Sequence, residues 1–464
     1  MLTLRAEQSE CLWDVVLPVE ALGLPEDLAV IDVLLGEEEL LWPIVERWRS
    51  EFLETGRLVL SEGRPTIAME SFVRLMVLKA RYGWGYRTLV SEVSDSLHLR
   101  RFCRIGLSAR VPDESTVRKL TRRVGAEMVN EITRALIEKA CREKRFRARA
   151  VRIDSTVIEA DVKYPTDSGL AAHGVRVLAR EGRKLAALLK ETKTRVRDRS
   201  RSMGGVLRAI SRTLRRRTGE AKSEVLELTA KTGKLLEQSL KETRRLAALA
   251  RKRARGRGAK TKLAAAGELE VLADRCERIV RQIEQRVAGE PIADRLVSLS
   301  DPDARPIRKG KLNKPTEFGY VTQICEVTEN TRRGARGLIL PSASTPGNPG
   351  ENTLLPTTVA ELTRLGISPR EIALDGGFQT GPTTDSLAPL KPERVFISGR
   401  QQPTSKRTQR RLQRYRTGAE GRISHLKRGY GLRRSRLKGD EGQRTWTGWG
   451  ILAYNLDTLA IRTS

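Results

Sequence analysis

A strongly basic stretch with a helical pattern divides this chain of 464 residues. Residues 176–262 contain 28 lysines and arginines against 8 aspartates and glutamates, a net charge of +20 within a total of +30. Almost no proline or aromatic residue interrupts the stretch, which indicates long helices. The charge favours contact with phosphates over a solvated surface that binds nothing. It also argues against an ordinary small-molecule enzyme as the first interpretation.

Apolar residues just after this stretch recur at spacings of three and four, which is typical of a coiled-coil seam. They are Leu269, Leu272, Cys276, Ile279, Ile283 and Val287. We therefore expect residues 166–299 to form a basic helical and coiled-coil insertion.

Residues 1–145 have the pattern of an all-α N-terminal domain. The run from Pro112 to Thr116 supplies cap residues and early acids, so it predicts a helix that starts near Asp113 or Ser115. That helix is basic. Such a group of helices could form a helix-turn-helix reader of DNA or a packing and dimerisation domain, and the sequence leaves both interpretations open.

The remaining parts, residues 146–165 and 300–464, change to the alternating pattern of strands. The expected strands are 146–158, 318–328, 338–340, 371–374 and 394–397, with helices at 357–365 and 409–430. Three early strands followed by alternating helices and strands are the layout of an α/β ribonuclease-H-like catalytic core. This core would be a mixed five-stranded sheet with helices on both faces, and the basic insertion would interrupt it after the first strand.

Two aspartates occupy positions in this pattern where a functional site is expected. Asp154 lies in the first predicted strand, and Asp375 follows the fourth, directly before Gly376 and Gly377. Open α/β sheets place their sites at the carboxyl ends of strands, and paired glycines leave room for a ligand. Each aspartate alone is also an ordinary strand or turn residue, so the interpretation depends on a third acid.

Glu420 is that third acid. From Arg400 to Lys438 it is the single acid among 14 lysines and arginines. The helix there carries an apolar stripe that should dock on the sheet, with Glu420 at the edge of the stripe. A local ion pair with Arg416 would explain Glu420 alone. Together with two aspartates in matching elements, it indicates three carboxylates that hold two Mg²⁺ ions, because hard cations prefer carboxylate and phosphate oxygens.

These segments resemble the DDE transposases of bacterial insertion sequences. Residues 152–168 are similar to the first-aspartate region of the group called ISNCY, and residues 374–378 are similar to the second-aspartate motif. Residues 418–427 resemble the glutamate motif. Around that glutamate the family often carries Tyr-x2-Arg-x3-Glu-x6-Lys, to which Arg416, Glu420 and Lys427 correspond, whereas Gln413 stands at the tyrosine position.

The resemblance implies a metal-dependent DNA transposase that cuts at terminal inverted repeats and joins the freed 3′-hydroxyl ends to target DNA. It implies that Asp154, Asp375 and Glu420 are the catalytic residues and metal ligands, with Mg²⁺ as cofactor and Mn²⁺ as a substitute. Double-stranded DNA would be the partner, and a homodimer would form the synaptic complex. The expected DNA contacts are Arg416, Lys427, Arg422, Arg428, Arg251, Lys252, Arg253 and Arg255.

Two other functions stay open at this point. One is a nuclease of the same fold that cuts without joining, and the other is a non-catalytic, domesticated DNA-binding protein. No apolar run is long enough to span a membrane, and the N-terminus lacks the pattern of a signal peptide. Five scattered cysteines indicate neither a disulfide framework nor a zinc site. We therefore expect a cytoplasmic protein of the bacterial nucleoid.

Replacing four cations of the insertion by glutamine should weaken DNA binding in a salt-dependent way. The change is Arg251, Lys252, Arg253 and Arg255 to Gln. Each lost phosphate contact removes about 0.9 from the slope of log K against log salt, so the slope should flatten by about 2–4. Binding measured across a salt series checks this, and preference for the terminal repeat should change little. An unchanged slope would assign the segment to packing instead.

Overall fold

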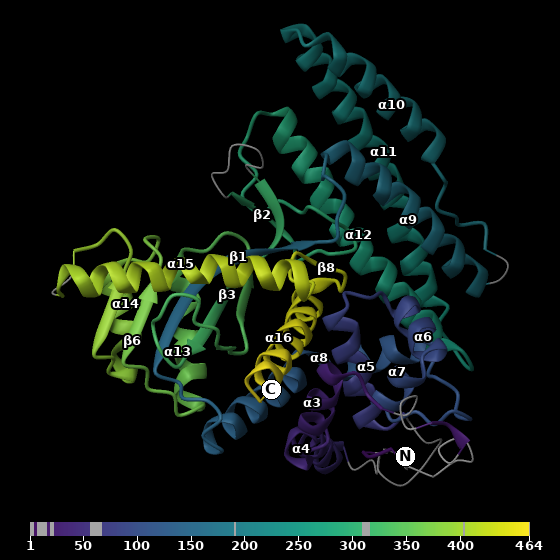
Figure 1. The fold of residues 1–464 in the computed structure, drawn as a ribbon. Coiled ribbons are helices and arrows are strands. Elements are labelled where there is room, and N and C mark those ends of the chain that lie inside the picture. The colour runs from purple at the N-terminus through teal and green to yellow at the C-terminus, as the bar shows by residue number, and fades with distance from the viewer. Residues whose placement is uncertain are drawn as a thin grey trace. The chain divides into compact units, whose positions relative to one another are not determined.

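The computed structural model describes residues 4–6, 16–18, 23–55, 67–189, 192–308, 316–401 and 404–463. The chain forms two compact units (Figure 1). One contains Met1–Asp161 and Tyr320–Ser464, and the other contains Val162–Gly319. None of the described helices combines the length and apolarity needed to cross a membrane.

Helices precede the sheet in the first unit. The longest, α8, begins where the cap residues predict, because the Asp113 carboxylate accepts hydrogen bonds from the backbone of its first turn. It kinks at Gly125, whose φ of 69° favours glycine, and the freed N–H of Ala126 donates to Glu441 at 2.7 Å. The helices are α3 (Glu26–Leu35), α4 (Glu38–Thr55), α5 (Met69–Arg81), α6 (Tyr86–Asp95), α7 (Leu97–Phe102) and α8 (Glu114–Arg142).

The described strands form one mixed sheet with the order β2-β3-β1-β6-β7. β4 and β5 also pair with β3, and β8 pairs with β1. β1, β6 and β7 are mutually parallel along this path, whereas β2, β4 and β5 run antiparallel to β3. The strands are β1 (Ala150–Ala160), β2 (Arg305–Arg308), β3 (Thr316–Thr328), β4 (Leu338–Ile339), β5 (Ala343–Pro346), β6 (Glu371–Leu374), β7 (Arg394–Ile397) and β8 (Arg434–Ser435).

The structure confirms an α/β fold with a mixed sheet, but the predicted set of five strands was too small. β1, β3, β4, β6 and β7 correspond to the predicted strands, and β2, β5 and β8 are additional. The additional strands have two to four residues, which is too short for an alternating pattern to show. β2 pairs with residues 316–319 at the start of β3, inside the second unit.

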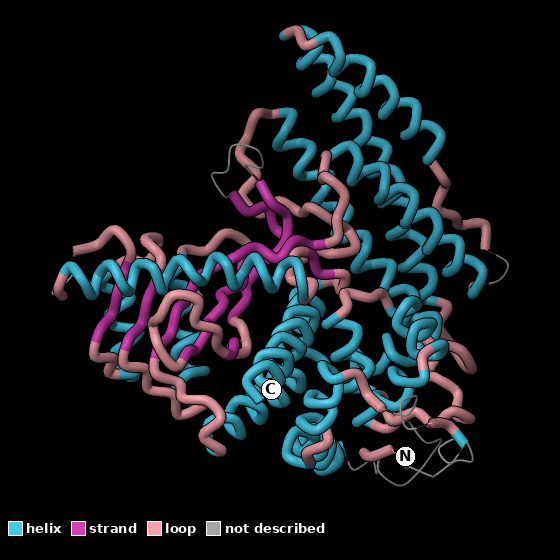
Figure 2. Tube along the Cα trace, viewed as in Figure 1, coloured by secondary structure: helices cyan, strands magenta, loops and turns pink. Residues whose placement is uncertain are grey.

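Helices cover both faces of the sheet in the first unit. Ala150 of β1 packs with Leu412 and Tyr415 of α15 (Lys406–Gly429). Val151 and Ile153 of β1 alternate with Ala150, so they point to the opposite face of the sheet. They belong to the hydrophobic cluster that contains the apolar side of α13 (Leu355–Arg364) and α14 (Thr380–Leu387). Since neighbouring residues of a strand point to opposite faces, α15 lies on one face and α13 and α14 lie on the other. Figure 2 shows α15 running across the strands.

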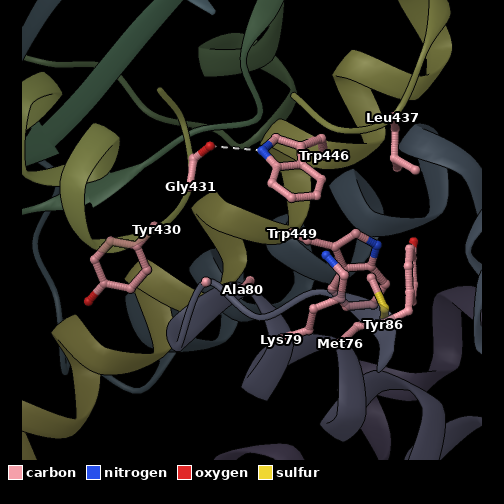
Figure 3. A pocket seen from close by; sticks show the side chains of 10 residues that line it. Met76, Lys79, Ala80, Tyr86, Tyr430, Gly431, Leu437, Trp446 and Trp449 are labelled. Carbon is pink, nitrogen blue, oxygen red and sulfur yellow. Dashed lines mark hydrogen bonds between the residues drawn. The ribbon is translucent and has the colours of Figure 1, made fainter. Parts of the chain in front are cut away.

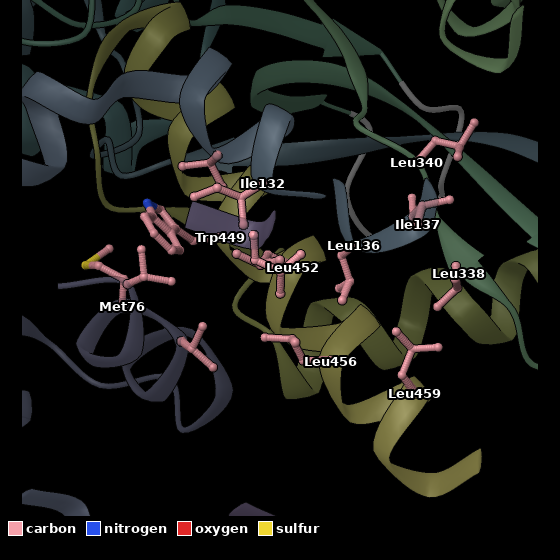
Figure 4. Packing of buried hydrophobic residues seen from close by; sticks show 14 of the residues in the cluster. Met76, Ile132, Leu136, Ile137, Leu338, Leu340, Trp449, Leu452, Leu456 and Leu459 are labelled. Atoms are coloured by element: carbon pink, nitrogen blue, oxygen red, sulfur yellow. The ribbon is translucent and has the colours of Figure 1, made fainter. Parts of the chain in front are cut away.

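The closing helix α16 (Gly439–Thr463) joins the N-terminal helices to the sheet. Figure 4 shows its Leu452 and Leu456 beside Ile132 and Leu136 of α8, within one continuous core. Asn455 of the same helix accepts from the N–H of Ile339 and donates to its C=O, both at 2.8 Å. The helical N-terminal part and the sheet therefore share a core inside one unit.

The second unit is a helical bundle. It contains α9 (Asp167–Leu188), α10 (Ser200–Thr213), α11 (Gly219–Lys252) and α12 (Ala259–Val287). The predicted seam lies on α12, where Leu269, Cys276, Ile279 and Ile283 are buried and Val287 is 42% exposed. This seam packs against α9 and α11 of the same chain, as shown by the close approach of Ile283 to Gly233. The bundle of this chain therefore buries most of the predicted seam.

Arg152 of β1 lies buried beneath α15 and fixes where that helix sits. Its guanidinium donates to the Glu326 carboxylate of β3 at 2.8 Å, to the Tyr415 C=O at 3.0 Å and to the Ala335 C=O at 2.9 Å. A Cβ on Gly418 would lie 1.9 Å from its Nη1 atom. Because these acceptors hold the guanidinium in place, it cannot withdraw from a larger residue.

Gly418→Ala should destabilise the protein, although alanine favours helices over glycine by about 1 kcal/mol. The added methyl group would collide with the Arg152 guanidinium and displace α15. Gly421 lies on the same helix with nothing within 4 Å of its Cβ position, so Gly421→Ala is a matched control that should be about 0.5–1 kcal/mol more stable than the wild type. Urea unfolding measures both, and equal stabilisation would contradict this account of Arg152.

Candidate active site

The register of β1 and β6 places two aspartates side by side. The strands are parallel, and Ile153 lies opposite Leu374 in the ladder. Asp154 and Asp375 each follow this pair by one residue. Asp154 shares its face of the sheet with Arg152, and Asp375 shares its face with Ala373, so both carboxylates emerge on the face covered by α15.

Arg416 of α15 joins the second aspartate to the glutamate. Its Nη1 atom lies 2.9 Å from Oδ1 of Asp375, and its Nη2 atom lies 3.0 Å from Oε1 of Glu420. The arginine is buried, whereas the Glu420 side chain is 62% exposed. The local pair that the sequence offered as the plainer explanation of Glu420 therefore exists, and the same guanidinium also binds Asp375.

Asp154 is a half-buried carboxylate with few stabilising contacts. Its Oδ1 atom accepts a hydrogen bond from the Ser155 N–H at 2.8 Å. Burial, together with the negative charges of Asp375 and Glu351, raises the pKa of Asp154 from 3.8 to about 6, against the opposing effects of the Ser155 N–H and Arg416. Asp154 therefore lies within electrostatic reach of two other acids and one cation.

Glu351 is an acid at this site that the sequence analysis missed. It begins the short 3-10 turn η2 (Glu351–Thr353), and its Oε2 atom is buried without a hydrogen-bond partner in the described structure. A Cβ on Gly377 would lie 2.9 Å from its Cγ atom, so Glu351 lies against the loop that follows Asp375. The surrounding prolines and glycines mark a loop, and they give no reason to expect an acid beside a strand 200 residues earlier.

The carboxylates at this site are suitable ligands for a hard divalent cation, although they are not arranged as a complete coordination shell. Carboxylate oxygens are the ligands that Mg²⁺ prefers, and the unpartnered oxygen of Glu351 has no other cation. Within the described ranges, however, no three acidic, histidine or cysteine side chains are arranged closely enough to hold an ion. The pairing of Asp375 and Glu420 with Arg416 accounts for this, since the guanidinium lies where both carboxylates would meet a cation.

The cations expected to contact DNA near Glu420 differ in their availability. Arg422 is largely buried and pairs with the Glu326 carboxylate at 3.0 Å, so it holds α15 on the sheet and is not free to reach a phosphate. Arg428 is exposed, and Lys427 is half-buried. Arg416 is occupied by its two carboxylates. Arg428 is therefore the better candidate for a phosphate contact, and the contact of Lys427 with DNA stays a prediction.

The four cations of the insertion lie at the end of α11 in the second unit. Arg251 is exposed but pairs with Glu270 of α12 at 2.5 Å. Lys252, Arg253 and Arg255 are exposed, make no ion pair among the described residues, and line a recess of about 470 Å³. This recess is a concentrated positive surface within the insertion.

A separate small cavity of about 20 Å³ in the first unit is lined by Lys79, among other residues (Figure 3). The ammonium group lies 4.2 Å from the ring centroid of Trp446 and 4.8 Å from that of Tyr86. Burial lowers the pKa of Lys79 to about 8, and the charge of Arg436 acts in the same direction. The cavity has room for about one water molecule and contains none of the four acids, so it is not the candidate site.

Two parts of the chain match known protein families. Residues 33–123 match the family described as Transposase domain (DUF772), and residues 334–456 match the family described as Transposase DDE domain. One relative, the "Uncharacterized protein ORF8 in nfe locus" of Rhizobium meliloti, is 27% identical over 143 residues, which is 30% of this chain and 69% of the relative. No solved structure matches the chain.

Asp154→Asn should stabilise the protein in the absence of metal. The folded chain binds the Asp154 proton more tightly than the unfolded chain, so stability falls as the pH rises from about 4 to about 6. Above pH 6 the cost is on the order of 2–3 kcal/mol, since a tenfold change in proton affinity is about 1.4 kcal/mol. Urea unfolding in EDTA should show a more stable variant at pH 7.5, with its advantage lost near pH 4. A variant less stable than the wild type at pH 7.5 would contradict the expected cost of ionising Asp154.

Proposed function

We infer that this chain is a DNA transposase of the insertion-sequence DDE family, which its matches to a transposase domain and a Transposase DDE domain support, and we propose that Asp154, Asp375 and Glu420 form its catalytic site. The observation that carries the proposal is the parallel register of β1 and β6, which sets Asp154 beside Asp375 beneath the helix that bears Glu420. The two family matches do not assign the chain to the ISNCY group.

We propose a ribonuclease-H-like architecture for the sheet and its covering helices. Antiparallel early strands, followed by parallel β6 and β7 with helices on both faces, support this assignment. In the same proposal, residues 1–145 serve in DNA binding or dimerisation, 146–165 and 300–464 form the catalytic domain, and 166–299 form the basic insertion. The proposed domains differ from the compact units, because α16 packs on the N-terminal helices.

The proposed reaction has two steps. Water attacks a phosphodiester at the transposon end, and the departing 3′-oxygen takes a proton. The freed 3′-hydroxyl then attacks a target phosphodiester and releases the target's 3′-oxygen. Mg²⁺, with Mn²⁺ as its substitute, would supply activation of the attacking oxygen and stabilisation of the leaving oxygen.

The residues of this chain would divide the remaining work. Asp154, Asp375 and Glu420 would hold the divalent cations. Arg416 would act as a positioning residue, since it keeps Asp375 and Glu420 together before an ion binds. Lys427 and Arg428 would bind phosphates of the transposon end. These phosphate contacts would position the DNA without reading its bases.

The insertion would add backbone contacts of its own. Its exposed cations Lys252, Arg253 and Arg255 line a recess to which a phosphate is complementary in charge. A homodimer would bring two transposon ends together, and a DNA substrate would place the protein at the nucleoid.

Asp154→Asn should abolish strand cleavage and joining while leaving DNA binding intact, because it removes a ligand charge and almost no volume. The substrate is a DNA duplex that carries the terminal repeats of the transposon. It is incubated with the protein, a supercoiled target plasmid and Mg²⁺. Asp161→Asn is the matched control, since Asp161 is exposed just beyond β1 and should leave activity unchanged.

Each product of this assay selects among the candidate functions. Joined products from the wild type support a transposase, and nicks without joining would indicate a nuclease. Binding without Mg²⁺-dependent cleavage would indicate a non-catalytic DNA-binding protein. Full cleavage by Asp154→Asn would remove Asp154 from the site.

A further inference from the structure

We propose that Glu351 is a further ligand of the divalent cation, which it would bind together with Asp154. This inference rests on the proposed function and adds a fourth carboxylate to the three that the sequence predicts. It would make the 3-10 turn η2 part of the metal site, alongside β1, β6 and α15.

The distribution of charge at the site leaves two carboxylates without a cation. Arg416 neutralises Asp375 and Glu420 together. Asp154 accepts the Ser155 N–H, and in the described structure neither Asp154 nor Glu351 has an ion pair. One guanidinium among four carboxylates leaves an excess of negative charge, and the excess lies on Asp154 and Glu351.

Glu351 has an oxygen that is buried and unsatisfied. Its Oε2 atom has no hydrogen-bond donor in the described structure. Removing a carboxylate oxygen from water without a partner is costly, and an ion that binds to it would remove that cost. Glu351 lies against the loop that follows Asp375, since a Cβ on Gly377 would come within 2.9 Å of its Cγ atom, and the register of β1 and β6 sets Asp154 beside Asp375.

The turn that carries Glu351 is held on several sides. The side-chain amide of Gln323, on β3, donates to the Glu351 C=O at 3.2 Å. The adjacent Asn352 donates to Thr383 and accepts from the Gln379 N–H, both at 2.8 Å. These bonds tie the turn to the sheet and to the loop after β6, so the carboxylate is positioned before any ion arrives.

Gly377 leaves the space that Glu351 occupies. A Cβ at this position would lie 2.9 Å from Cγ of Glu351, so any larger residue would push the carboxylate away. Gly377 follows Asp375 by two residues. The same short loop therefore presents one acid and makes room for another.

Binding of Mn²⁺ to the full-length protein without DNA tests the proposal. The free ion is followed by electron paramagnetic resonance at pH 7.5, which requires no catalytic turnover. Glu351→Gln keeps the shape of the side chain and should weaken Mn²⁺ affinity by about tenfold or more. Glu393→Gln is the matched control, because it makes the same charge change on an exposed residue of the same unit and should leave affinity unchanged.

A second pair of variants tests the position of Glu351 without changing any charge. Gly377→Ala should weaken Mn²⁺ binding by displacing Glu351. Gly381→Ala, four residues on and with nothing within 4 Å of its Cβ position, should bind as the wild type does.

Asp154→Asn separates failure of this inference from failure of the proposed function. Weaker binding by Asp154→Asn together with wild-type binding by Glu351→Gln would overturn the role of Glu351 alone. Wild-type binding by both variants, or no saturable binding by the wild type, would overturn the proposed metal site as well. Weaker binding by Asp154→Asn, Glu351→Gln and Gly377→Ala, with both controls unchanged, is the expected result.

Discussion

A buried guanidinium between one helix and the sheet decides where the acids of this protein meet. Arg152 donates to Glu326 on β3 and to the Tyr415 C=O on α15. A buried guanidinium without its acceptors would be strongly destabilising, so α15 has one favourable position on the sheet. Arg422, which follows Glu420 on α15, also pairs with Glu326. With both anchors in place, Arg416 faces Asp375.

The large positive charge of the chain therefore has two uses. Arg152 and Arg416 are buried and Arg422 is half-buried, and all three bind carboxylates that hold the site together. Lys252, Arg253 and Arg255 of the insertion and Arg428 of α15 are exposed, so they are the cations that could reach DNA phosphates. Net charge correctly indicated a polyanionic partner, but the total overstates how many cations can reach it.

The candidate site also carries a stability cost that its function explains. Arg416 pairs with Asp375 and Glu420, while the negative charges of Asp375 and Glu351 add to burial in raising the pKa of Asp154. A divalent cation would remove the cost, so an arrangement that is unfavourable alone suits a site that binds metal. The buried Oε2 atom of Glu351, which has no hydrogen-bond partner in the described structure, adds to this stability cost.

Periodicity was enough to find the longer strands and helices, and cap and turn residues marked the start of α8 and the position of Asp375, because these signals are local in the sequence. The short strands β2, β5 and β8 exist only through pairing with strands already in place, so no local pattern predicts them. The seam on α12 was visible, but only the tertiary structure decided that its own bundle covers it. Glu351 became a site residue through the packing of a loop against Gly377, a contact between segments whose meeting no spacing in the sequence records.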